Sequence, residues 1–146
     1  MKMSKLQTVT AKNAGDAREW AICADCGISR SRHDSSDYRT ASDICVGSRH
    51  ISVKSSGATL MNGTMCEGQT TFDGIWNVYS KNTHSNEWAY VTADFTAYYM
   101  DKGEFEAFLR QFARVERDSE KNGGQMKIRL RKESKKMLGW LANMAS

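Results

Sequence analysis

Apolar residues recur every three or four positions in four segments of this chain, which is the spacing of one face of a helix. The segments span residues 13–26, 71–82, 102–117 and 133–144. In the first, the apolar stripe consists of Ala17, Trp20, Ala21 and Ala24, and Gly27 follows as a C-terminal stop. Six aromatic side chains with helical spacing are expected in the core: Phe72, Trp76, Tyr79, Phe105, Phe108 and Phe112.

Strand-like segments separate these helices. They span residues 43–46, 49–55, 87–92, 95–100 and 126–130, and the first two are joined by a turn at Gly47 and Ser48. We expect a loose or extended lead-in at residues 1–12, a long polar loop at residues 30–42 and irregular structure at residues 56–68. The order is helix, two strands, helix, two strands, helix, strand, helix. We therefore expect a single α/β or α+β domain over residues 1–146, with a central mixed sheet flanked by helices.

The hairpin at residues 43–55 places polar groups together. A turn centred on Gly47 puts Asp43 opposite residues 52 and 53, to within about one residue of register. Because side chains alternate along a strand, Ser52 and Lys54 share one face. The Asp43 carboxylate is therefore expected close to Ser52 and Lys54.

Asp43, the triplet Ser52-Val53-Lys54 and Glu19 on the preceding helix resemble the site of the PD-(D/E)xK nuclease superfamily, which includes small type II restriction endonucleases. In that superfamily an acid at a strand start and a second acid on the next strand hold Mg²⁺. A lysine two residues further on positions or activates the attacking water, and a glutamate on the first helix often joins the site. The resemblance covers roughly residues 15–55. It implies a restriction-endonuclease-like core, with Asp43 and Glu19 as metal ligands and Lys54 assisting the water.

Ser52 departs from this pattern, because it stands where the second acid is expected. Mg²⁺ prefers oxygen ligands and usually takes one or two carboxylates. A neutral hydroxyl cannot replace that charge, although it could hold an outer-shell water. Glu19, Asp37 or Glu67 could supply the missing carboxylate. Considered one at a time, these residues have other interpretations. Asp43 is also typical of an acid in a turn, and Glu19 and Lys54 are also typical of solvated surface charges.

Positive charge is concentrated near the C-terminus. Residues 121–136 hold seven bases and one acid, so this segment has a net charge of +6 and the rest of the chain −2. Such a basic end predicts a polyanionic partner, although a basic face that is only solvated would give the same charge pattern in the sequence. The expected phosphate contacts are Arg129, Arg131, Lys132, Lys135 and Lys136.

These features favour a Mg²⁺-dependent DNA endonuclease acting on duplex DNA, and the resemblance also implies a homodimer. The alternative is a catalytically inactive member of the same fold that binds nucleic acid or protein, such as a phage or mobile-element inhibitor or regulator of a host nucleic-acid system. A third hypothesis is a protein-binding domain with no role in nucleic-acid binding.

Two further features bear on the compartment. No apolar run approaches the ~18 residues of a membrane span, and residues 1–10 lack an apolar signal core. We therefore expect a cytoplasmic (intracellular) protein without a membrane partner. Cys23-x-x-Cys26 lacks the second close pair of a zinc site, so Cys23, Cys26, Cys45 and Cys66 are expected as reduced, mostly buried thiols.

Overall fold

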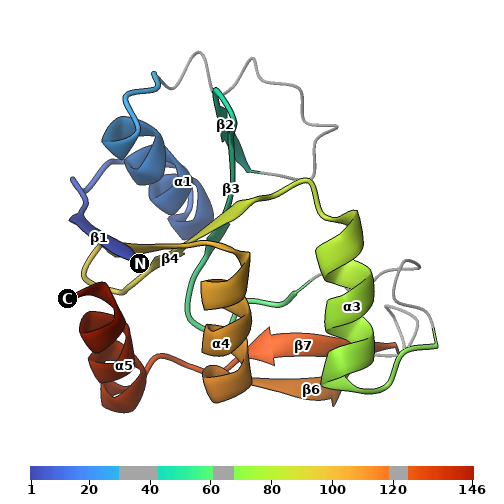
Figure 1. Cartoon of the computed structure of the whole chain (residues 1–146). Coiled ribbons are helices and arrows are strands. Elements are labelled where there is room, and N and C mark those ends of the chain that lie inside the picture. Colours follow the sequence, from blue (N-terminus) through green and yellow to red (C-terminus); the bar gives the residue numbers. More distant parts are fainter. Residues whose placement is uncertain (30–42, 61–67, 119–124) are drawn as a thin grey trace.

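The computed structural model describes residues 1–29, 43–60, 68–118 and 125–146. Within these ranges the chain forms a mixed α+β fold with four helices, a five-stranded mixed sheet and a two-stranded sheet (Figure 1). The helices are α1 (Ala14–Asp25), α3 (Phe72–Asn82), α4 (Lys102–Phe112) and α5 (Lys135–Ala145). The strands are β1 (Lys2–Lys5), β2 (Ile44–Val46), β3 (Arg49–Lys54), β4 (Glu87–Val91), β5 (Thr96–Met100), β6 (Ala113–Arg117) and β7 (Met126–Leu130).

The larger sheet has the strand order β1-β5-β4-β3-β2. β3 and β4 are parallel, whereas the other neighbouring pairs are antiparallel. The parallel pair follows from the connection, since α3 lies between β3 and β4 in the sequence and returns the chain to the same end of the sheet. The sheet thus combines a β2–β3 hairpin, a helical crossover and a β4–β5 hairpin.

Alternation along the central strands divides the core into two clusters, one on each face of the sheet. On β4, Trp88 and Tyr90 pack with the aromatic residues of α3 and α4, while Ala89 and Val91 pack with α1. The Trp88 and Phe105 rings stack with their centroids 4.9 Å apart. The six aromatic side chains expected in the core all belong to the cluster that holds Trp88, with Phe72 partly buried at its edge.

The two-stranded sheet is fastened to the segment that leaves β3. Ser55 to Ala58 form a turn in which Ala58 N donates to Ser55 O at 3.0 Å and Gly57 has a φ of +74°. The chain then runs alongside β7: Leu130 N donates to Ala58 O at 2.8 Å, and Leu60 N to Ile128 O at 2.7 Å. The basic strand β7 is therefore held close to the carboxyl end of β3.

Most of the expected elements are confirmed, including an extended lead-in at the N-terminus, and two expectations are wrong. Residues 113–117 form β6 rather than the end of a helix, because they pair with β7 in antiparallel register from Ala113↔Leu130 onward. Residues 2–5 form β1, paired with β5. On α1, Ala24 is exposed, and the buried face runs through residues 21–23 instead. The expected loop at 30–42 lies outside the described residues.

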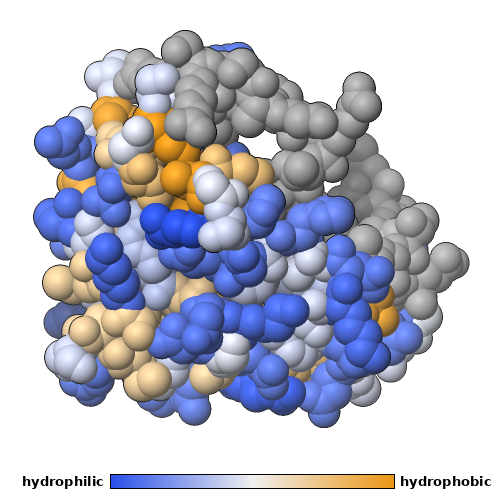
Figure 2. Space-filling view, turned by 45° about the horizontal axis from the view of Figure 1, so that its top comes forward, coloured by the Kyte–Doolittle hydropathy of each residue, from blue (hydrophilic) through white to orange (hydrophobic). Residues whose placement is uncertain are grey.

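The surface is largely hydrophilic on the face seen in Figure 2, with hydrophobic residues gathered in an upper and a lower area on the left of the view. In the described part of the chain, Met3 and Met144 are the large hydrophobic side chains that are exposed. No helix in the described ranges combines the length and apolar character that a bilayer crossing requires.

Candidate functional site

Three of the residues singled out in the sequence lie together in the structure. Glu19 from α1, Asp43 immediately before β2 and Lys54 at the end of β3 line one pocket of about 210 Å³. Gly15, Arg18, Val53 and Ser55 complete its lining. We call this the acid–lysine pocket. It lies at the carboxyl end of β3, which is one of the two parallel strands, and ligands of α/β sheets commonly bind at such ends.

The hairpin register places the Asp43 carboxylate as the sequence predicts. Ile44 pairs with Ile51, so Asp43 falls beside residues 52 and 53. Its Oδ2 accepts a hydrogen bond from Val53 N at 2.8 Å. This bond joins the start of β2 to the end of β3 and fixes the carboxylate at the pocket wall.

Lys54 shares the pocket with this carboxylate. Burial lowers the pKa of the Lys54 ammonium, and the Asp43 charge acts in the opposite direction. An ammonium with a lowered pKa releases its proton more readily than a solvated lysine. Lys54 therefore has the surroundings of a group that can exchange a proton with a nearby water or hold an anion in place.

Ser52 does not belong to this pocket. Its side chain is 5% exposed, and its hydroxyl lies 2.6 Å from the hydroxyl of Ser85. Burial raises the pKa of the neighbouring Tyr79 hydroxyl, and the Ser52 hydroxyl acts in the opposite direction. Ser52 is thus a buried, hydrogen-bonded group on the same strand face as Lys54, and we revise its expected role as a site residue. The physical reason is the connection between α3 and β4, which covers it with Ser85.

The pocket offers two carboxylates to a cation, those of Glu19 and Asp43. Within the described ranges, no group of three or more His, Cys, Asp or Glu side chains has a metal-binding arrangement. Mg²⁺ nevertheless fits this donor set, because it is commonly held by one or two carboxylates and keeps several waters. Asp37 and Glu67, the other acids considered from the sequence, lie outside the described residues.

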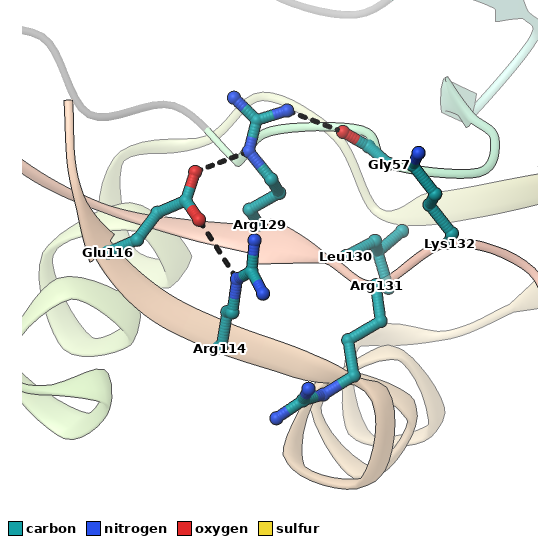
Figure 3. Close-up of a pocket in the computed structure, with 7 residues that line it drawn as sticks. All are labelled: Gly57, Arg114, Glu116, Arg129, Leu130, Arg131 and Lys132. Carbon is teal, nitrogen blue, oxygen red and sulfur yellow. Dashed lines mark hydrogen bonds and ion pairs between the residues drawn. The ribbon is translucent and has the colours of Figure 1, made fainter. Parts of the chain in front are cut away.

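A second pocket, of about 500 Å³, is lined mainly by cations (Figure 3). Four basic residues and one acid surround it: Arg114, Arg129, Arg131, Lys132 and Glu116, with Gly57 and Leu130. We call this the basic pocket. The sequence does not point to Arg114 and Glu116, because helical spacing extends through residues 113–117. The alternation of Ala113 and Val115 with Arg114 and Glu116 is the available signal for a strand.

The predicted phosphate contacts differ in their surroundings. Arg129 is engaged within the protein: its Nε donates to Glu116 Oε1 at 2.5 Å and its Nη1 to Gly57 O at 3.1 Å. Arg131 and Lys132 line the same pocket and are exposed. Lys135 and Lys136 are exposed in the first turn of α5 and do not line it.

The two pockets adjoin through the Ser55–Ala58 turn. Lys54 and Ser55 line the acid–lysine pocket, and Gly57 lines the basic pocket. The first and last Cα atoms of a β-turn lie within about 7 Å of each other. A ligand that occupies one pocket and extends along the surface can therefore reach the other.

Comparison with known proteins adds no relative: no protein-family model, curated protein or solved structure matches the chain.

Proposed function

We propose that this protein is a Mg²⁺-dependent endonuclease that hydrolyses phosphodiester bonds of duplex DNA, with a restriction-endonuclease-like core. One observation carries the proposal: Glu19, Asp43 and Lys54, from three different elements, line a single pocket. The neighbouring basic pocket supports the choice of a polyanionic substrate. The order of α1 and the β2–β3 hairpin is compatible with the expected core.

Each residue has a defined part in this proposal. Asp43 and Glu19 would hold the cation, which when bound would neutralise charge on the scissile phosphate and promote ionisation of water. The Val53 N–H holds one oxygen of Asp43, so the carboxylate is oriented before any ligand arrives. Lys54 would place its ammonium beside the attacking water and exchange a proton with it. Arg131, Lys132, Lys135 and Lys136 would contact the DNA backbone without reading its sequence.

The test is cleavage of duplex DNA in the presence of Mg²⁺ by four proteins. Asp43→Asn keeps an oxygen for the Val53 N–H but removes the charge, and Lys54→Met removes the ammonium at similar size. We expect each to lower the cleavage rate by a factor of about 10² or more, the usual contribution of a proton-transfer group or metal ligand. Glu106→Gln, on the partly exposed face of α4 and outside both pockets, serves as the control and should cleave like the wild type. Equal rates for all four proteins would contradict the proposal.

The second candidate is a nucleic-acid-binding protein of the same fold without catalysis. Its supporting observation is Ser52, a buried hydroxyl where the family pattern expects an acid, which leaves two carboxylates at the pocket. This candidate predicts salt-dependent DNA binding with no cleavage in either Mg²⁺ or Mn²⁺. Cleavage that disappears in Asp43→Asn would exclude it.

A further inference from the structure

The basic pocket differs from an ordinary positively charged surface, because one carboxylate in it holds two arginine side chains. Glu116 accepts a hydrogen bond from Arg114 Nε at 2.9 Å and one from Arg129 Nε at 2.5 Å, each with a different carboxylate oxygen. Figure 3 shows the two guanidinium groups turned toward this one carboxylate. Since a guanidinium has five N–H donors, most of the donors of Arg114 remain for another acceptor. Glu116 therefore orients two arginines in advance of a ligand.

The charge of the pocket is unbalanced. Among the described residues, its lining has four cationic side chains and one anionic side chain. Close by in the sequence, Lys135 and Lys136 occupy the first turn of α5, and this turn contains no acid. Positive side chains there oppose the helix dipole, so they cost stability unless an anion is near. The basic pocket and the first turn of α5 thus both carry positive charge that a bound anion would offset.

We infer that the basic pocket is a phosphate subsite for the sugar–phosphate backbone of a nucleic acid, next to the phosphate that would be cleaved. The inference rests on the proposed function for the identity of the ligand, but the binding itself does not require catalysis. Arg114 and Arg129, oriented by Glu116, form its wall, and Arg131 and Lys132 extend from the loop after β7. Glu116 acts here as a positioning residue.

The position of the pocket supports a backbone phosphate of the same substrate. The ends of the Ser55–Ala58 turn border the two pockets, and the first and last Cα atoms of such a turn lie within about 7 Å of each other. One strand of a duplex carries a phosphate about every 3.4 Å along the helix axis. The subsite would therefore hold a phosphate that lies only a few nucleotides from the one at Lys54. Since such a contact touches no base, its contribution should not depend on sequence.

The experiment measures binding without metal, so that cleavage plays no part. Fluorescence anisotropy of the full-length protein with two labelled duplexes of unrelated sequence, in EDTA and from 50 to 300 mM salt, gives the slope of log K against log salt. The test variant is Arg131→Gln/Lys132→Gln, because neither side chain has a carboxylate partner among the described residues and their loss leaves no acid unpaired. The control is Lys12→Gln/Lys81→Gln, which removes the same charge from two exposed lysines outside both pockets.

We expect the test variant to bind both duplexes several-fold more weakly, with a salt slope smaller by about 1 for each residue removed. The control should change little. An unchanged slope, an equal change in the control, or a loss on only one of the two duplexes would overturn the inference. If the slope falls as expected and the wild type cuts no DNA in Mg²⁺, the phosphate subsite stands and the proposed hydrolysis fails. Urea unfolding of both variants verifies that each is folded.

Discussion

The Ser52→Glu substitution tests the acid–lysine pocket most sharply, because it introduces an acid at the position where the PD-(D/E)xK pattern has one. The structure predicts that this acid does not join the pocket. Ser52 is 5% exposed and its hydroxyl is 2.6 Å from that of Ser85, so a longer side chain that carries a carboxyl group has no access to the acid–lysine pocket from there. The substitution should destabilise the protein and leave its affinity for divalent cations unchanged.

The loss of unfolding free energy expected for Ser52→Glu follows from the cost of burying a carboxyl group. Burial holds such a group protonated, and each pH unit by which it stays protonated above its ordinary range costs about 1.4 kcal/mol. At pH 7 this amounts to about 3 to 4 kcal/mol of the free energy of unfolding, and the added volume costs about 1 kcal/mol more. Because the carboxyl binds its proton more tightly in the folded state, the loss should be largest at neutral pH and shrink as the pH falls toward 4.

The assay combines urea unfolding at pH 7 and pH 4.5 with calorimetric titration of Mn²⁺. Ser55→Glu is the matched control, since Ser55 lines the acid–lysine pocket and is only half-buried. It introduces the same carboxylate into the pocket itself, so it should cost less than about 1 kcal/mol and raise Mn²⁺ affinity. A Ser52→Glu protein as stable as the wild type, with tighter Mn²⁺ binding, would refute this reasoning and return residue 52 to the metal site.

Three further predictions concern the framework of the two pockets. Gly57→Ala should destabilise the protein by about 1 kcal/mol, because a φ of +74° strains an L-residue. Gly139 is exposed within α5, so Gly139→Ala should stabilise the protein by about 0.5 to 1 kcal/mol. The urea midpoint of each variant shows the sign of its effect. Trp88→Ala removes a fully buried ring and should cost about 3 to 5 kcal/mol; an unfolding free energy within 1 kcal/mol of the wild type would contradict the core assignment. Hydrogen bonds from Arg129 and, to a smaller extent, Arg114 lower the pKa of the Glu116 carboxyl. The stability that this carboxylate contributes is therefore present above its unfolded-state pKa and is lost as the pH falls through its folded-state pKa. The difference in unfolding free energy between the wild type and Glu116→Gln should shrink in acid, and a difference that stays constant from pH 7 to pH 3 would contradict this prediction.

The acid–lysine pocket could be predicted from the sequence because its central relationship is local. Asp43 and Lys54 are joined by a hairpin whose turn sets the register, and the alternation of apolar residues determines which face each side chain takes. Glu19 entered the prediction through the resemblance to a nuclease site, and the structure places it at the same pocket. The burial of Ser52 could not be predicted from the hairpin, because it depends on Ser85, which lies 33 residues away in the sequence.

The basic pocket could be predicted only in part, because its geometry depends on long-range pairing. Helical periodicity extended through residue 117, but pairing with β7 outweighs it from Ala113 onward, since tertiary contacts commonly override local propensity. The charge count identified the basic segment correctly as a region but could not show that Arg129 is already engaged by Glu116. Nor could it show that Lys127 is buried against Asp118, with its Nζ 2.8 Å from the carboxylate. Formal charge in a sequence thus overstates the charge that a surface presents to a ligand.

The second carboxylate of the acid–lysine pocket comes from α1, which makes the placement of this helix relevant to the proposed chemistry. In the family pattern both acids lie on adjacent strands, whereas here the two acids of the pocket come from α1 and from the hairpin. A cation held by Glu19 and Asp43 would therefore join two elements that otherwise meet through the apolar cluster around Ile22 and Ile51. Since a ligand that binds only the folded state stabilises it by mass action, cation binding would oppose the separation of α1 from the sheet. The placement of α1 is then part of the site, and substitutions that loosen its packing should weaken cation binding even though they touch no carboxylate.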